Sequence, residues 1–442
     1  MPRLESWSII QPTLSNPEGH QYPPLIPLEP PSLPAVLPQL PSPQRSPAWL
    51  PDGWIHTTHI VPAAYPRSSP DAILPEASVF DANSGKSDRQ KLTAERLEQL
   101  LALREKEKGK TSRNDKLLWL CFNRYARKNT DGKGLTLFFT HANGFCKEIW
   151  ETTISSFLSS RSERYVTEMW VWDAVNQGDS ALLNRGNLNS LCHWHDPTRD
   201  TLSFLLHHIP SKPTLSVPTH LSRVTSAESA LRKSQGFSDR KIVMVGHSFG
   251  GAVSALAACN CPVLFDSLFL VDPVIVKPGP PRSYDLMRGA LSRRDRWKNR
   301  EEATSQLLST PFFQRWDPEV VKSYVDFGMY DTEDGQVTLK TPSLQEAIMF
   351  VDTFTGCNEA WVRLFRGELD ERIEVRWVVP GFGEIELGLP GATQERVSLR
   401  KNASNVLIDG AGHLIAQERP KKLAKELSLF LERKYGSAQA NL

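Results

Sequence analysis

The chain has 442 residues, 40% of them hydrophobic and 23% charged, so it can bury a large core and form one large domain with appendages. Its 52 basic and 50 acidic residues give a formal net charge of +2, and this balance gives no indication of a nucleic acid or an anionic membrane as partner. Six cysteines are too few for a disulfide framework in a chain this long, which favours a reducing compartment.

The sequence shows neither a secretory signal nor a membrane-spanning segment. Residues 1–7 lack a basic region followed by an apolar run. No apolar stretch approaches the ~20 residues that a spanning helix needs. We therefore expect an intracellular protein without a transmembrane segment.

Proline dominates the start of the chain. Residues 1–88 hold 18 of the 33 prolines, and such a segment favours extended conformations over helices and central strands. We expect residues 1–88 to form a proline-rich arm that is poorly ordered or lies on the core. Residues 89–442 would then form the main domain.

Apolar periodicity predicts the elements that follow. A helix is expected over residues 89–110, with Leu92, Leu97, Leu100 and Leu101 on one side. Short apolar runs predict strands at residues 116–122, 134–140, 164–173, 242–245, 268–271, 375–379 and 405–408. Because helical stretches separate the later strands, we expect a mostly parallel sheet that is covered on both faces.

The most informative motif is Gly246-His-Ser-Phe-Gly250, which follows an apolar strand and precedes a helix of small residues. A strand, Gly-x-Ser-x-Gly and a helix in this order are typical of the nucleophile elbow of α/β-hydrolases. The tight turn needs residues without bulk on either side of the serine, as Gly246 and Gly250 provide. The motif predicts Ser248 as the nucleophile.

A charged, aromatic run of helical pattern lies between the strands at residues 268–271 and 375–379. It includes Trp297, Phe312, Phe313, Trp316 and Tyr324. In this fold an insertion after the sixth strand usually covers the active site, so we expect a helical lid at about residues 276–345. The alternative is a set of additional core helices at the sheet edge.

A serine nucleophile needs an adjacent base and two amide donors for the developing oxyanion. The base is expected to be His413, on a glycine-rich loop after the last strand and in the required chain order. One donor should be the N–H of Phe249, directly after the serine. The other should be the N–H of Asn143, with Gly144 as the next choice.

Two carboxylates could orient the imidazole of His413. Asp272 follows the strand at 268–271, where the sheet would fix its position, and we prefer it. Glu384, with Glu386 behind it, follows the strand at 375–379 and is the alternative triad acid.

Four blocks stand out in chain order: His141-Ala-Asn-Gly-Phe-Cys-Lys-Glu-Ile-Trp150, Trp172-Asp-Ala-Val-Asn-Gln-Gly-Asp-Ser180, Gly246-His-Ser-Phe-Gly-Gly251 and Leu270-Val-Asp-Pro-Val274. Together they resemble one fungal group of α/β-hydrolases, over roughly residues 115–435. This group contains peroxisomal lipase-like proteins, toxin-biosynthesis hydrolases and acyl-CoA hydrolases. The resemblance implies hydrolysis of an ester or thioester of a sizeable apolar acyl group, and an acid after strand six.

Other readings stay open beside a serine ester or thioester hydrolase. A carbon–carbon bond hydrolase or a cofactor-free perhydrolase would use the same triad, and a ligand-binding protein would retain only the fold. We expect no cofactor and no metal, since Cys192, His193 and His195 lack the further ligands of a zinc site. The C-terminal Ala440-Asn-Leu442 resembles a weak peroxisomal signal, which would make an import receptor a partner. Without such a signal the protein would be cytoplasmic.

Overall fold

The computed structural model describes residues 5–75, 80–81, 83–108, 110, 112–130, 132–279, 284–351 and 353–436. The C-terminal Ala440-Asn-Leu442, interpreted above as a peroxisomal signal, lies outside them. None of the helices in these ranges is long and apolar enough to cross a bilayer.

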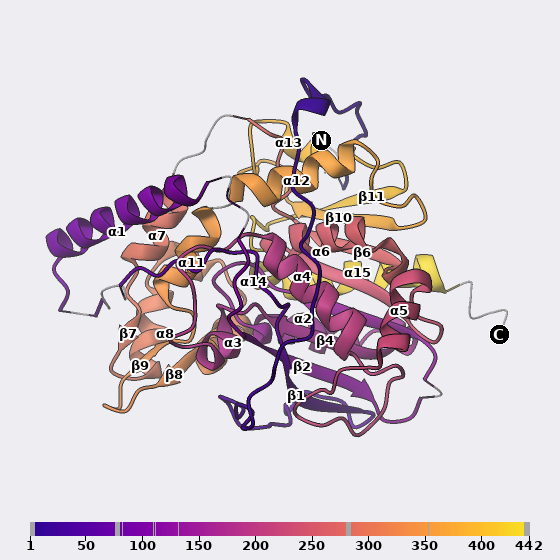
Figure 1. The fold of residues 1–442 in the computed structure, drawn as a ribbon, viewed down its shortest axis with the longest axis horizontal. Coiled ribbons are helices and arrows are strands. Elements are labelled where there is room, and N and C mark those ends of the chain that lie inside the picture. The colour runs from indigo at the N-terminus through magenta and orange to yellow at the C-terminus, as the bar shows by residue number, and fades with distance from the viewer. Residues whose placement is uncertain are drawn as a thin grey trace.

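An eight-stranded sheet forms the centre of the molecule (Figure 1). Its first two pairings, β1 with β2 and β2 with β4, are antiparallel, whereas the other five are parallel. The predicted α/β-hydrolase architecture is therefore confirmed, and each of the seven predicted strands overlaps an observed one. In spatial order the strands are β1 (Trp54–Pro62), β2 (Trp119–Arg127), β4 (Val166–Asp173), β3 (Leu135–Thr140), β5 (Lys241–His247), β6 (Ser267–Val271), β10 (Glu374–Pro380) and β11 (Ala403–Ile408).

Strand β1 lies inside the segment expected to be an arm outside the main domain. The paired sheet therefore begins at Trp54, before the boundary placed at residue 88. Residues 54–61 contain no proline and include β-branched residues, so they can pair along their whole length with β2. As β1 is the edge strand, Pro62 can end it without removing a central ladder bond.

Both faces of the sheet are buried, because successive side chains of β5 enter different core clusters. Ile242 and Met244 pack on one side, and Val243 and Val245 pack on the other. In Figure 1, α4 and α6 lie in front of the sheet and α15 lies behind it. The first cluster includes residues of α4 (His195–Ser203), α6 (Phe249–Asn260) and α12 (Thr353–Phe365), and the second includes residues of α2 (Glu151–Leu158) and α15 (Pro420–Tyr435).

The segment after β6 contains more than the predicted helices. It also includes a three-stranded sheet, formed in spatial order by β7 (Arg296–Trp297), β9 (Val337–Leu339) and β8 (Met329–Asp331). Strands of two or three residues are too short to show an alternating pattern, so they could not be predicted from the sequence. The helices here are α7 (Asp285–Ser292), α8 (Arg300–Leu308), α9 (Pro311–Gln314), α10 (Pro318–Phe327) and α11 (Ser343–Val351).

The predicted N-terminal helix is α1 (Lys86–Glu107), which lies beside α7 at the left of Figure 1. It buries Leu97 and Leu100, whereas Leu92 is exposed. The remaining α-helices of the described ranges are α3 (Gly178–Leu183), α5 (Ser226–Gln235), α13 (Ala392–Val397) and α14 (Ile415–Glu418).

The described part of the proline-rich segment is an extended strap across the core (Figure 1). The Asn405 side chain bonds both the N–H and the carbonyl of Trp7, at 2.6 and 3.0 Å. The buried Arg199 guanidinium donates to the carbonyls of Ile26 and Pro27 at 2.9 and 3.1 Å. Core side chains thus satisfy several backbone polar groups in the described part of this strap.

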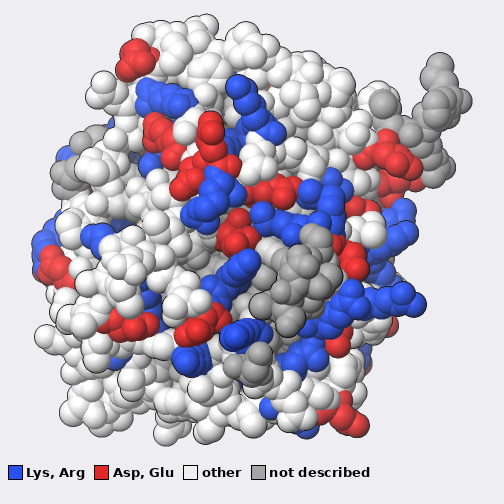
Figure 2. Space-filling view, turned by 90° about the vertical axis from the view of Figure 1, so that its right-hand side faces the viewer, with Lys and Arg blue, Asp and Glu red and all other residues white. Residues whose placement is uncertain are grey.

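On the face shown in Figure 2, basic and acidic side chains are interleaved. This agrees with the balanced composition of the chain. Such a surface presents no extended field of one sign on this side of the molecule.

Candidate active site

Ser248 occupies a sharp turn between β5 and α6. Its φ of 57° is in the left-handed region, which is costly for a residue with a Cβ. A Cβ at Gly246 would lie 2.7 Å from Gly251 Cα, and one at Gly250 would lie 2.6 Å from the carbonyl oxygen of Thr140. The two glycines are therefore required by close backbone contacts, and the turn has the geometry predicted from the motif.

The turn is fixed to the neighbouring strand. The Ser248 N–H donates to the Val271 carbonyl at 3.0 Å, and the Ser248 carbonyl accepts from the Val274 N–H at 2.9 Å. Both partners belong to the end of β6 and the residues just after it. The sheet thus holds Ser248 beside Asp272.

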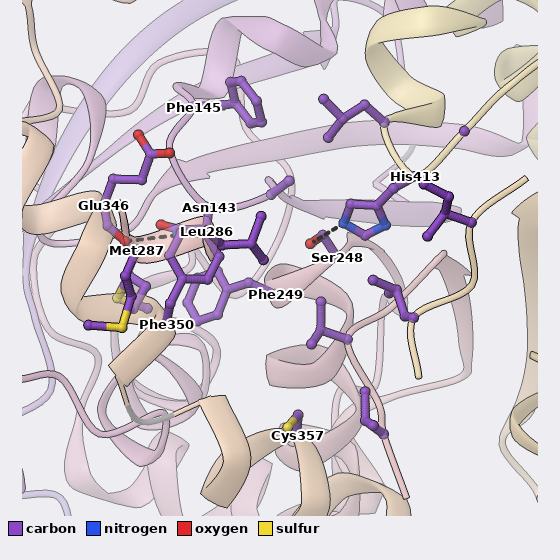
Figure 3. A pocket seen from close by; sticks show the side chains of 18 of the residues that line it. Asn143, Phe145, Ser248, Phe249, Leu286, Met287, Glu346, Phe350, Cys357 and His413 are labelled. Atoms are coloured by element: carbon purple, nitrogen blue, oxygen red, sulfur yellow. Dashed lines mark hydrogen bonds between the residues drawn. The ribbon is translucent and has the colours of Figure 1, made fainter. Parts of the chain in front are cut away.

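His413 connects Ser248 to Asp272. Its Nε2 lies 2.9 Å from the Ser248 Oγ, as Figure 3 shows, and its Nδ1 lies 2.6 Å from Asp272 Oδ2. Residues 165 positions apart in the chain are thereby placed in one hydrogen-bonded series. This series can move a proton from the serine hydroxyl to the imidazole.

Asp272 is buried at the tip of β6, where its N–H donates to the Val378 carbonyl of β10 at 2.7 Å. Its second oxygen, Oδ1, accepts from Arg396 Nη2 at 2.6 Å. Burial alone would raise the pKa of the Asp272 carboxyl, but Arg396 and His413 together hold it below its ordinary value. Asp272 is therefore kept ionised beside the imidazole.

The alternative acid is placed elsewhere. Glu384 forms an ion pair with Arg315 at 3.0 Å, and Arg315 also contacts Glu418 at 2.9 Å. The Glu386 carboxylate accepts the backbone N–H groups of Gly391 and Thr393 at 2.9 and 2.7 Å. The structure thus brings Asp272 to His413 and directs Glu384 to Arg315.

The two expected oxyanion donors border the same pocket as Ser248. Phe249 begins α6 directly after the serine, and Asn143 follows β3. Gln177 orders this second loop, since it accepts from the Gly144 N–H at 2.8 Å and donates to Asn143 Oδ1 at 2.7 Å. With the Gly144 amide engaged, Asn143 remains the better candidate of the two.

Two further histidines flank the site in neutral form. Burial lowers the pKa of His141 to about 4 and that of His247 to about 3. The Nε2 of His247 lies 2.9 Å from the His413 carbonyl, so it can steady the histidine loop. Both imidazoles are therefore uncharged near pH 7.

The pocket above Ser248 has a volume of about 620 Å³ and is predominantly apolar. In Figure 3 the imidazole of His413 and the hydroxyl of Ser248 meet inside this ring of side chains. Several charged groups also line it, among them Lys277, Arg315 and Glu346. The apolar lining includes Phe145, Trp194, Val274, Val276, Leu286, Met287, Phe312, Met349, Phe350 and Ile385.

The cysteine and histidines considered for zinc have other surroundings. His195 Nε2 lies 2.6 Å from a Glu359 oxygen, and Cys192 is buried. Within the described ranges no three His, Cys, Asp or Glu side chains converge as a metal site would need.

Sequence reasoning missed two residues of the site, Arg396 and Gln177. Arg396 is 124 positions from Asp272, and Gln177 is 34 positions from Asn143. Gln177 lies in one of the four blocks that carry the family resemblance, but its contact with Asn143 depends on tertiary structure. No local pattern marked Arg396.

The model of the alpha/beta hydrolase family matches residues 137–426. Among curated proteins, the peroxisomal membrane protein LPX1 of Saccharomyces cerevisiae is 26% identical over 66% of this chain and 74% of its own length. The type I acyl-CoA thioesterase mpaH of Penicillium brevicompactum is 28% identical, over 38% of this chain and only 34% of the thioesterase. The abhydrolase domain-containing protein ACTT2-1 of Alternaria alternata is 32% identical over 25% of this chain and 44% of its own.

Among solved structures, the peroxisomal alpha-beta-hydrolase Lpx1 of Saccharomyces cerevisiae superposes with a TM-score of 0.62. It is 18% identical in that alignment, which covers 87% of this chain and 90% of Lpx1. The resemblance to fungal hydrolases expected from four sequence blocks is thus confirmed, and the chain belongs to the alpha/beta hydrolase family.

Proposed function

We propose that this protein is a serine hydrolase that cleaves an ester or thioester of a sizeable apolar acyl group. The observation that carries the proposal is the hydrogen-bonded series of Ser248, His413 and Asp272, with contacts of 2.9 and 2.6 Å. In this proposal Ser248 is the nucleophile, His413 the base, and Asp272 the group that orients the base.

The first half of the reaction would transfer the acyl group to the enzyme. With Nδ1–H donating to Asp272, the free electron pair of His413 Nε2 accepts the Ser248 proton as Oγ attacks the acyl carbon. The Phe249 and Asn143 N–H groups would stabilise the oxyanion. His413 then gives its proton to the leaving alkoxide or thiolate, and the C–O or C–S bond breaks.

The second half would release the acid. His413 removes a proton from water as the water oxygen attacks the acyl-enzyme, and then returns that proton to Ser248 Oγ as the ester bond breaks. The products are the carboxylic acid and the free enzyme, so the cycle consumes one water. The residues involved supply all the proton transfers, and the proposed cycle uses no cofactor.

The pocket supports an apolar acyl group as the part of the substrate that is bound. Its lining consists mainly of aromatic and aliphatic side chains. Burial of hydrocarbon against such a lining lowers the free energy of binding by about 25 cal/mol per Å² of apolar surface. The relative from Penicillium brevicompactum is named an acyl-CoA thioesterase, which supports thioesters as one substrate class.

The insertion after β6 is proposed as the lid of this pocket. Leu286 and Met287 of α7, Phe312 of α9, and Met349 and Phe350 of α11 line the pocket. Trp297, Trp316 and Tyr324 instead belong to the second core cluster, so part of the insertion packs as core.

A peroxisomal location is also proposed. One relative is named a peroxisomal membrane protein, and the C-terminal Ala440-Asn-Leu442 resembles a weak import signal. An import receptor would then be a partner.

A panel of p-nitrophenyl esters and acyl-CoAs tests the proposed function. We expect turnover that rises from acetyl to octanoyl groups and is lost in Ser248→Ala. Glu384→Gln is the matched control, since it alters a pocket residue outside the triad. Absence of turnover on every ester and thioester, with retained binding of the apolar acids, would instead indicate a ligand-binding protein.

A further inference from the structure

Arg396 stands directly behind the triad carboxylate. It lies on α13, in the connection between β10 and β11, and its side chain is fully buried. Its Nη2 donates to Asp272 Oδ1 at 2.6 Å, and Asp272 is itself only 1% exposed. A buried ion pair of this kind is costly to assemble and gives no assured gain in stability over apolar residues.

We propose that Arg396 is a positioning residue for the triad: it fixes the orientation of Asp272 and offsets part of the carboxylate charge that acts on His413. The proposal rests on the proposed serine hydrolase function. It assigns to one buried guanidinium two separable effects, one geometric and one electrostatic.

The geometric effect follows from the two oxygens of Asp272. Oδ1 accepts from Arg396 and Oδ2 accepts from the Nδ1–H of His413. A guanidinium can only donate, so it requires an acceptor and keeps Oδ1 turned away from the imidazole. The remaining oxygen is then held 2.6 Å from Nδ1, which selects the tautomer with a free Nε2.

The electrostatic effect has a defined sign. When His413 takes the serine proton, the charges along the series are positive, negative and positive. The Asp272 carboxylate favours the imidazolium and the Arg396 guanidinium disfavours it. Removal of the Arg396 charge should therefore favour the imidazolium and change the pH dependence of kcat/KM.

Other charged groups near His413 and Arg396 are more exposed or are balanced. Arg315, Glu384 and Glu418 lie against Gly412, where Arg315 pairs with both carboxylates and its side chain is 46% exposed. His247 is neutral through burial, which lowers its pKa to about 3. The Glu386 carboxylate interacts electrostatically with Arg396, but it accepts hydrogen bonds from the backbone N–H groups of Gly391 and Thr393.

The test compares Arg396→Gln with Arg396→Lys. Gln can still donate to Asp272 but is neutral. The acid limb of the pH profile, where kcat/KM falls as the pH is lowered, should therefore move to higher pH by about one unit, which is a tenfold loss of kcat/KM at a given pH on that limb. Lys retains the charge but not the planar fork, so kcat should fall severalfold while the limb stays in place. Arg400→Gln is the control, because Arg400 is buried in the same connection but donates to the carbonyls of Leu369 and Asp370.

The proposal is overturned if the limb of Arg396→Gln does not move, or if it moves equally in Arg396→Lys. Should Arg396→Gln fail to fold, Arg396→Lys decides alone: a shifted limb, or an unchanged kcat, contradicts the proposal. The imidazole signals of the histidines, followed by NMR against pH with His413→Gln for assignment, give the same comparison without turnover. A shift of the His413 signal in an inactive protein would keep this inference and reject the proposed function.

Discussion

Substituting Asn for Asp272 should abolish most activity for a reason that the structure makes specific. Arg396 must face an acceptor, so the Asn oxygen turns toward it and the NH₂ group turns toward His413. Nδ1 must then accept and Nε2 must carry the hydrogen, which leaves no electron pair to take the Ser248 proton. A wrong tautomer of this kind lowers kcat by about 10⁴, or about 5 kcal/mol in the barrier.

The substitution also leaves the buried Arg396 charge without its counter-ion, which costs about 3–5 kcal/mol of stability. Rates should therefore be measured on octanoyl and acetyl esters well below the melting temperature and per folded protein by near-UV circular dichroism. Glu384→Gln is the matched control. It removes one of two carboxylates from the half-exposed Arg315, worth less than about 1 kcal/mol, so less than a tenfold loss is expected.

The reverse ranking would refute this reasoning. If Asp272→Asn kept kcat within tenfold of wild type while Glu384→Gln lost three orders of magnitude or more, the acid would be Glu384. The contact of His413 with Asp272 would then be structural.

Further predictions concern the lid, the location and the pH dependence of stability. Because Phe312 lines the pocket, Phe312→Ala should reduce the turnover of octanoyl esters more than that of acetyl esters. Phe313→Ala should mainly lower the melting temperature, because Phe313 packs on Trp316 and Tyr324. Equal losses on all esters for Phe312→Ala would argue against a lid. A fluorescent fusion that masks Leu442 should stay cytosolic while one with a free C-terminus enters peroxisomes at least in part, and identical diffuse patterns would reject the signal. Burial lowers the pKa of six histidines to about 3 or 4, below their ordinary 6.5. The folded state therefore binds fewer protons than the unfolded state, and the free energy of unfolding should fall as pH drops from about 6.5 towards 4. An unchanged urea midpoint between pH 7.5 and 4.5 would contradict this prediction.

Local patterns in the sequence predicted the sheet and the elbow well. The apolar run at 242–245 and the glycines around Ser248 indicate a strand and a turn, and the residues that determine both lie within about a dozen positions of one another. The tip of β6 was predictable in the same way, because Asp272 directly follows an apolar run. The short strands β7, β8 and β9 carried no such pattern.

Features that depend on distant contacts could not be predicted. Strand β1 was missed because the prolines around it obscured an alternating segment whose partner, β2, begins 57 residues after the end of β1 at Pro62. The choice between Asp272 and Glu384 was open because both follow neighbouring strands. In the structure Asp272 contacts His413 whereas Glu384 pairs with Arg315, and no local pattern in the sequence shows this difference.

The most direct test of the central claim is covalent labelling of Ser248 by a fluorophosphonate, read by intact mass and peptide mapping. We predict one adduct per chain on the peptide that contains Ser248, and none in Ser248→Ala, which should also lose about 10³-fold or more in kcat. Labelling that persists in Ser248→Ala, or wild-type protein that turns over esters without any adduct on this peptide, would contradict the assignment of Ser248 as the nucleophile.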